Sequence, residues 1–217
     1  DNSIPDCGVN WHHTLPPMIL ENWSGHFEHF TNRFTTIASW GSYKDLKYKN
    51  DWYCDKSYEF ERFSNLPKYA RQEFEILLKD FQKDDKVVKK LGEGGWYIYG
   101  SNKLSTVEKY QTYINKSRAE IGIAKNAYVK GHSGWFSDRS ACYLASGRPV
   151  IAQSTGLESL LPTGNGFLTF RTMDEAVAGV DTINKSYKTH CQAARDFAEE
   201  YLNHEKVLTK MLGFCTS

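Results

Sequence analysis

The sequence predicts an α/β domain in which a parallel β-sheet is covered by helices on both faces. Short apolar runs of strand length alternate along the chain with segments whose apolar residues repeat at helical spacing. Two successive predicted strands in the second half also end in polar loops that contain glycine. Because parallel strands of an open sheet end on one edge, these loops are expected to line one ligand-binding crevice.

The first half of the chain has this alternation of strands and helices. The expected elements in order are a strand at 34–40, a loop or hairpin at 45–55, a helix at 57–69, a strand at 74–78, a helix at 84–91 and a strand at 96–99. Gly92 is expected to close the second of these helices. The next helix is expected to begin at Ser105, where Glu108 stands at the position of a capping box.

The second half continues the pattern and carries the predicted binding loops. Here the sequence predicts strands at 119–124, 149–152 and 167–170 and helices at 139–146, 173–186 and 187–202, with 207–212 expected to finish the last of them. Ser137 and Asp138 are good N-cap residues for the helix at 139–146, and Gly147 closes it. Thr172 is expected to cap the helix at 173–186.

Size and composition indicate an ordinary soluble domain. The chain has 217 residues, of which 40% are hydrophobic, and no apolar run approaches the roughly 20 residues that a membrane span needs. Residues 1–33, rich in Pro, Trp and His, are expected to form an irregular arm or interdomain linker, and residues 34–217 a single domain. The five cysteines are widely spaced and form no C-x-x-C pair, which favours a reducing, cytoplasmic location.

Charge and histidine content narrow the range of ligands. The 27 basic and 26 acidic residues produce no overall field that would attract nucleic acid. His12, His13, His26 and His29 lie close together in the sequence, but no Cys, Asp or Glu accompanies them at a recognised ligand spacing. The sequence therefore predicts no metal site.

The glycine turn before the helix at 139–146 is the main binding feature of the sequence. Residues 131–134 read Gly-His-Ser-Gly, and the glycines allow backbone conformations and close approaches that side chains forbid. The amino end of the following helix offers unpaired N–H groups and the positive end of a dipole, which suit a phosphate. Arg139 and Lys125 would add full positive charges.

Several short motifs occur in an order that resembles a known family. They are Gly134-Trp135-Phe136, Ala145-Ser146-Gly147-Arg148-Pro149-Val150, Thr155-Gly156-Leu157-Glu158, Gly164-Asn165-Gly166 and Asp174-Glu175-Ala176. This order resembles the carboxyl-terminal domain of GT-B glycosyltransferases, and the run SGWFSDRSACYLASGRPV is similar to a bacterial and phage group of such proteins. The resemblance implies one Rossmann-like lobe that binds a nucleotide diphosphate sugar, with the amino-terminal acceptor-binding lobe missing from this chain.

The resemblance also implies which residues bind the donor. The diphosphate would contact the amino end of the helix at 139–146, and the sugar or ribose would contact the loop after the strand at 149–152. The expected donor-binding residues are Lys125, Ser133, Gly134, Trp135, Phe136, Ser137, Asp138, Arg139, Gln153, Ser154, Thr155, Gly156 and Glu158, with Ser39, Trp40 and Gly41 as secondary candidates.

Two departures from the family leave the stereochemistry and the catalytic base open. Retaining members with a Glu-x7-Glu motif would have glutamates near Gly134 and Cys142, and neither position is acidic here. The run from His132 to Trp135 is similar to the His-Cys-Gly-Trp of plant-type inverting enzymes, but its spacing to Gly147 differs. No general base is assigned, and His132 is only a minor candidate for that role.

Three functions are consistent with these features. The first is the donor-binding part of a glycosyltransferase that uses a UDP- or GDP-type sugar donor without a metal. The second is a non-catalytic module that binds a nucleotide or a sugar phosphate. The third is a phage-type DNA-modifying glycosyltransferase, which rests on analogy alone. Turnover of a nucleotide sugar separates the first from the second, and a steep salt dependence of DNA binding would support the third.

Overall fold

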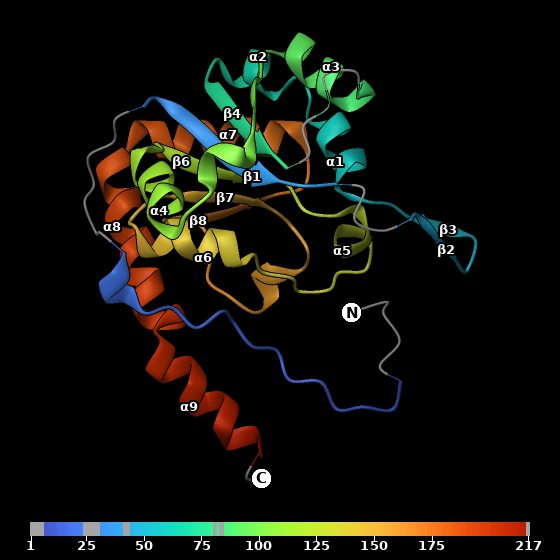
Figure 1. Cartoon of the computed structure of the whole chain (residues 1–217). Coiled ribbons are helices and arrows are strands. Elements are labelled where there is room, and N and C mark those ends of the chain that lie inside the picture. Colours follow the sequence, from blue (N-terminus) through green and yellow to red (C-terminus); the bar gives the residue numbers. More distant parts are fainter. Residues whose placement is uncertain (1–6, 24–30, 41–43, 80–81, 83–84, 216–217) are drawn as a thin grey trace.

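The computed structural model describes residues 7–23, 31–40, 44–79, 82 and 85–215, and it contains the predicted parallel sheet. Six strands pair in the order β5-β4-β1-β6-β7-β8, and every pairing is parallel (Figure 1). The strands are β1 (Arg33–Ala38), β4 (Glu73–Leu78), β5 (Tyr97–Gly100), β6 (Ala119–Gly122), β7 (Val150–Gln153) and β8 (Phe167–Phe170). The order reverses between β1 and β6, so a crevice is expected beyond the carboxyl ends of these two strands.

Helices cover both faces of the sheet, as the sequence predicts. One face packs against α1 (Lys56–Arg62), α2 (Leu66–Ala70), α3 (Lys86–Gly94) and α7 (Met173–Lys185). The other packs against α4 (Val107–Lys116), α6 (Asp138–Ala145) and α8 (Tyr187–Phe197), which a π-helical turn, Ala198–Leu202, extends. Each face has its own core of buried aliphatic and aromatic side chains. The sheet is therefore dry on both sides over most of its area, as a parallel sheet requires.

Most helix boundaries follow from capping residues that the sequence displays. Asp85 caps α3 by accepting the N–H groups of two residues in its first turn, and Gly95, with φ +99°, ends the helix. The expected end at Gly92 is therefore wrong, because Gly92 is an ordinary helical residue of α3. The predicted start of α4 at Ser105 is also wrong by one residue, because Thr106 accepts the capping hydrogen bond.

The predicted helix at 57–69 is in fact two helices, α1 and α2. Pro67 lies in the first turn of α2, where it has no N–H to donate to the preceding turn and so cannot continue α1. The break leaves the carbonyl of Ser64 free to accept the indole N–H of Trp96 at 3.0 Å. Gly94 also approaches this carbonyl so closely that no side chain fits there.

A β-hairpin and a short helix lie at the carboxyl edge of the sheet. The segment expected to be a loop or hairpin is a hairpin, β2 (Leu46–Tyr48) and β3 (Asp51–Tyr53), which projects from the body in Figure 1. Lys49 and Asn50 form its turn with φ of 46° and 66°, as a tight two-residue hairpin turn demands. Helix α5 (Asn126–Lys130), which the sequence analysis did not predict, follows β6 and packs against β3.

The described part of the arm and the last helix meet beside α8. The α4–α6–α8 core also buries Leu20, in the 3₁₀ turn Leu20–Asn22, and Met18, which lies just before this turn. The N–H of Met18 donates to the carbonyl of Leu202 at 2.7 Å. Helix α9 (His204–Cys215) then extends away from the body (Figure 1), and Val207 is its one buried residue within the described chain.

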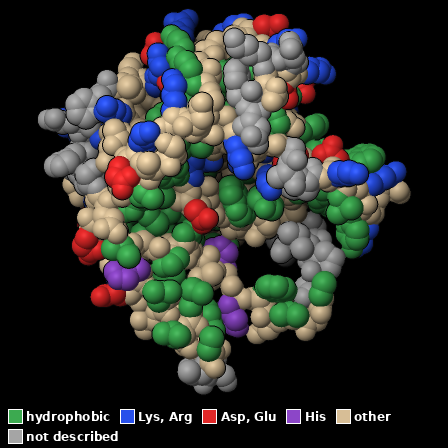
Figure 2. Space-filling model, viewed as in Figure 1, with side chains coloured by type: hydrophobic (Ala, Val, Ile, Leu, Met, Phe, Trp, Pro, Cys, Tyr) green, Lys and Arg blue, Asp and Glu red, His purple; other side chains and the backbone are tan. Residues whose placement is uncertain are grey.

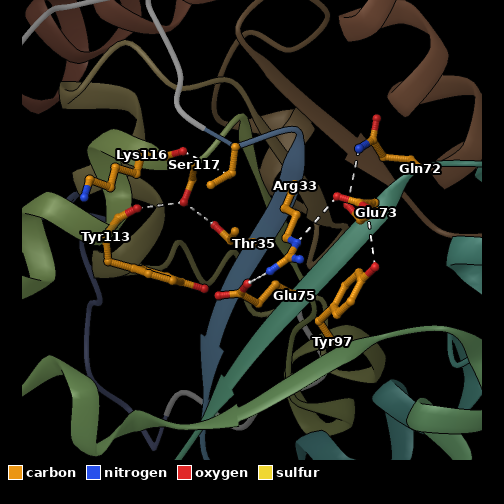
Figure 3. A network of polar contacts seen from close by, with 10 residues as sticks. Arg33, Thr35, Gln72, Glu73, Glu75, Tyr97, Tyr113, Lys116 and Ser117 are labelled. Carbon is orange, nitrogen blue, oxygen red and sulfur yellow. Dashed lines mark hydrogen bonds and ion pairs between the residues drawn. The ribbon is translucent and has the colours of Figure 1, made fainter.

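A polar network holds β1, β4 and β5 together beside α4 (Figure 3). Arg33 donates to Glu75 at 2.7 Å, and its guanidinium carbon lies 3.9 Å from the ring centroid of Tyr97. Tyr97 donates to Glu73 at 3.3 Å, and Thr35 contacts the hydroxyl of Ser117 at 2.6 Å. These contacts satisfy the polar groups of a sheet face that α4 covers only in part.

Gly166→Ala is expected to destabilise the fold more than Gly164→Ala. Both glycines have positive φ, +72° and +122°, so alanine is strained at either position. A Cβ on Gly166 would overlap the backbone of Ala193 and Ala194 in α8, whereas a Cβ on Gly164 would meet nothing within 4 Å. Urea unfolding should show the larger loss for Gly166→Ala, and equal losses would contradict the close packing of this turn on α8.

Candidate functional site

A cavity of about 520 Å³ lies where the strand order reverses, beyond the carboxyl end of β1 and beside α6. We call it the switch-point cavity. It is lined by Ile37, Ala38, Ser39, Lys56, Lys79, Ser101, Leu104, Tyr110, Trp135, Ser137, Asp138 and Arg139. Ligands of open α/β sheets bind in this position, because the loops there diverge to the two faces of the sheet.

Lys56, the first residue of α1, brings a buried positive charge to the cavity. The residue is only 7% exposed, and within the described chain its ammonium group has no hydrogen bond or ion pair. Its Nζ lies 5.6 Å from the ring centroid of Trp135. Burial, together with the positive charge of Arg139, lowers the pKa of Lys56 to about 7. A lysine in this state lacks a counter-ion that an anionic ligand would supply.

Arg139 lies beside Lys56 but is already paired. Its Nε donates to Glu120 and its Nη1 to the carbonyl of Ile37, each at 2.5 Å. Burial works against the charge on Arg139, but the Glu120 carboxylate raises the pKa of the guanidinium above its ordinary value. The other terminal nitrogen, Nη2, has no partner in the part of the chain that the structure describes. Arg139 thus keeps one edge of its guanidinium for a ligand.

The amino end of α6 supplies backbone donors at the same place. Ser137 is the N-cap, and the first helical hydrogen bond runs from Ala141 N–H to its carbonyl at 3.1 Å. The N–H groups of Asp138, Arg139 and Ser140 precede that bond and have no partner within the helix. The hydroxyl of Ser137 makes no capping hydrogen bond. This helix end therefore offers donors and a positive dipole to the cavity.

The glycine turn and the loop after β7 are hydrogen-bonded to each other. The N–H of Gly134 donates to the carbonyl of Thr155 at 2.7 Å, and the hydroxyl of Thr155 donates to the carbonyl of Trp135 at 2.8 Å. The hydroxyl oxygen of Ser133 accepts the N–H of Trp135 at 3.3 Å. Of these residues, Trp135 lines the switch-point cavity, and the rest support the loop that carries it.

Gln153 belongs to a buried network beneath the site. Its Nε2 donates to Glu59 at 2.7 Å, and its Oε1 accepts the N–H of Ala124 at 3.1 Å. Glu59 also accepts from Asn126 at 2.7 Å and from Arg62 at 2.6 Å. Both ends of the Gln153 amide are thus used within the protein, which places this residue as a support for the cavity wall.

The remaining predicted residues have defined places outside the cavity. Lys125 is the N-cap of α5, with Nζ 5.6 Å from the ring centroid of Tyr128. Phe136 is buried against Phe167, with ring centroids 5.5 Å apart. The hydroxyl of Ser154 donates to Glu158 at 2.7 Å, and Glu158 also forms an ion pair with Arg171. Gly156 has a φ of +89°, and His132 is exposed.

The secondary candidates separate in the structure. Ser39 lines the switch-point cavity. Trp40 packs on Phe60 with ring centroids 5.5 Å apart, and its indole N–H donates to Asp85 at 3.4 Å, so it belongs to the core. Gly41 lies outside the described residues, as do two of the four histidines considered as metal ligands, His26 and His29.

Sequence reasoning missed the residue that defines the site. Lys56 stands at the start of a helix, where a cation opposes the helix dipole and acidic residues are the favourable choice. That unfavourable placement, directly after the hairpin that follows the first strand, was the available signal. Lys79, Ser101 and Tyr110 were also missed, because they reach the cavity from three other segments that only the fold brings together.

No family model matches the sequence, and the comparison with curated proteins found no match. Solved GT-B glycosyltransferases are similar in fold, which makes this chain a Rossmann-like lobe of the GT-B type. A variant of Staphylococcus aureus TarM, in complex with fondaparinux, alpha-GlcNAc-glycerol and UDP, aligns with TM-score 0.61 and 14% identity over 93% of this chain and 38% of that chain.

Two further structures have the same relation to the chain. Anabaena HepE in complex with UDP-glucose aligns with TM-score 0.55 and 10% identity over 85% of this chain and 49% of that one. Sucrose-phosphate synthase from Thermosynechococcus elongatus aligns with TM-score 0.60 and 11% identity over 93% of this chain and 51% of that one. The chain thus spans about half or less of the length of each of the three proteins.

Neither a metal-binding cluster nor a helix able to cross a membrane occurs among the described residues. No group of three or more His, Cys, Asp or Glu side chains there is arranged to hold a metal ion. In that same part of the chain, no helix combines the length and the apolar character that crossing a membrane requires.

Lys56→Met is expected to stabilise the ligand-free protein at neutral pH, with a gain that shrinks as pH rises. Between pH 7 and the ordinary lysine pKa of 10.5, the unfolded chain binds a proton at this residue that the folded chain lacks. The wild type therefore regains up to about 1.4 kcal/mol of unfolding free energy per pH unit in this window. Below pH 7 the lysine is protonated in both the folded and the unfolded chain, so the full cost of burying its charge lowers the unfolding free energy of the wild type.

Urea unfolding at pH 6.5, 8 and 9.5 measures this difference between wild type and Lys56→Met. The matched control is Lys188→Met on the exposed face of α8, whose difference from wild type should not change over this range. A gap between wild type and Lys56→Met that stays constant, or widens with pH, would contradict the lowered pKa of Lys56.

Proposed function

We propose that this chain is the donor-binding part of a glycosyltransferase that takes its sugar from a nucleotide diphosphate sugar. The observation that carries the proposal is the buried amine of Lys56, which makes no hydrogen bond or ion pair among the described residues and faces a cavity at the reversal point of the sheet. An anionic ligand suits this residue best, since it would pair with the ammonium group and favour the protonated lysine.

The proposal assigns a role to each wall of the switch-point cavity. Lys56, the amides at the start of α6 and the free edge of Arg139 bind the diphosphate. They would also stabilise the charge that develops on the leaving nucleotide. The base and ribose lie toward Ser101 and Leu104, beyond the ends of β5 and β1. The sugar lies toward Trp135. The loop Ser154–Gly156, where the sequence predicted sugar contacts, does not line this cavity but supports the loop that carries Trp135.

The similar structures support a uridine nucleotide as the first ligand to test. Two of the three structures named above are complexes that contain UDP or UDP-glucose. A purely nucleotide-binding module remains the alternative, because no carboxylate or imidazole in the described chain stands out as a general base at this cavity. We infer that the catalytic base comes from a second lobe.

Calorimetric titration with UDP, GDP, ADP and TDP tests the donor site. We expect one of these diphosphates, UDP first, to bind the wild type and to raise its melting temperature. Lys56→Met should weaken that binding at least about tenfold, because it removes a charge-assisted contact to phosphate, while Lys188→Met should bind as the wild type does. Arg139→Ala is the poorer test, because it would leave Glu120 buried without its partner.

The outcomes separate the candidate functions. Release of the nucleoside diphosphate from its sugar, measured with a coupled assay, would support a transferase, and binding without release would support the binding module. If none of the four diphosphates binds the wild type, or if Lys56→Met binds as tightly as the wild type, the donor-site assignment is wrong.

A further inference from the structure

Three lysine–aromatic pairs lead from the switch-point cavity onto the projecting hairpin. The pairs are Lys125–Tyr128, Lys130–Tyr53 and Lys49–Tyr48, with distances from Nζ to the ring centroid of 5.6, 5.9 and 5.3 Å. We call these six residues the lysine–aromatic strip. Each pair combines a flat apolar ring with a cation close enough to interact with it.

The strip is continuous from the cavity to the tip of the hairpin. Its first aromatic residue, Tyr128, lies next to Trp135, which lines the cavity. The ring centroids of Tyr128 and Trp135 are 5.1 Å apart. Helix α5 carries the strip onward from Tyr128 to Lys130, whose Nζ donates to the carbonyl of Trp52 at 3.0 Å and forms an ion pair with Asp51 at 2.6 Å. On the hairpin, the rings of Tyr53 and Tyr48 lie 6.4 Å apart.

Core packing does not account for these rings. Tyr48, Tyr53 and Tyr128 are partly exposed and belong to neither of the two cores. Lys125, near the cavity, is half-buried, whereas Lys130 and Lys49 are exposed. Figure 2 shows lysine and hydrophobic side chains together over the hairpin. The hairpin forms a two-stranded sheet of its own, so the partly exposed faces of its rings are covered by no further strand of the described chain.

We propose that the strip binds an anionic glycan, the acceptor whose end reaches the switch-point cavity. Tyrosine rings offer flat faces to the C–H groups of sugar rings, and the lysines meet carboxylate or phosphate substituents on the same sugars. The acceptor role rests on the proposed function, whereas glycan binding does not. A nucleic acid fits less well, because Asp45 and Asp51 interrupt the lysines of the hairpin and the chain has a net charge of only +1.

Binding of oligogalacturonate, compared with a neutral maltooligosaccharide of equal length and with single-stranded DNA, tests this proposal. We expect oligogalacturonate to bind best. Tyr48→Ala/Tyr53→Ala and Lys49→Gln/Lys130→Gln should each weaken it about tenfold. The matched control is Tyr69→Ala/Lys68→Gln, on the exposed surface of α2, which should bind as the wild type does.

Four results would overturn the proposal. They are no oligogalacturonate binding, equal affinity for the neutral glycan, tighter binding of DNA with a steep salt dependence, and hairpin variants that bind as the wild type does. The diphosphate titration is run on the same hairpin variants, where it should be unchanged. A failure of the donor site therefore appears as lost diphosphate binding in the wild type, and a failure of the strip appears in the glycan titration alone.

Discussion

The carboxylate of Glu59 is the contact on which the carboxyl edge of the sheet depends. It is fully buried, and it accepts hydrogen bonds from Asn126 after β6 and from Gln153 at the end of β7. Glu59 lies one turn after Lys56 on α1, so the same helix that brings the cation to the cavity is fixed to both neighbouring loops. A buried carboxylate of this kind is tolerated only when it is hydrogen-bonded on all sides. The contacts of Glu59 with Asn126 and Gln153 therefore fix the position of α1 relative to the sheet.

Two buried cations line the site, and they differ in how far the fold pairs their charges. Arg139 is held by Glu120 and by a backbone carbonyl, so its charge is balanced inside the protein. Lys56 has no such balance among the described residues, and its pKa falls to about 7. A polar group that the fold has satisfied contributes to structure, whereas one that the fold leaves charged and unpaired indicates a ligand.

The fold could be predicted from the sequence further than the site could. The strand–helix alternation and local signals such as Thr172 at the start of α7 are encoded within a few residues, so they can be read without the structure. The role of Gln153 could not be predicted, because its partner Glu59 is distant in the sequence and lies on another element. Lys56 was missed for the same reason. Its burial is a property of the loops that surround it.

The charge state of Lys56 argues for a ligand with more than one negative charge. Burial and the nearby charges of Arg139 and Lys125 lower its pKa, whereas Glu120 raises it. A single negative charge would offset the lysine alone and leave the α6 helix end without an anion. A diphosphate bound as proposed would contact both groups and favour the protonated lysine. It would thereby offset the cost in stability that the buried lysine imposes near neutral pH.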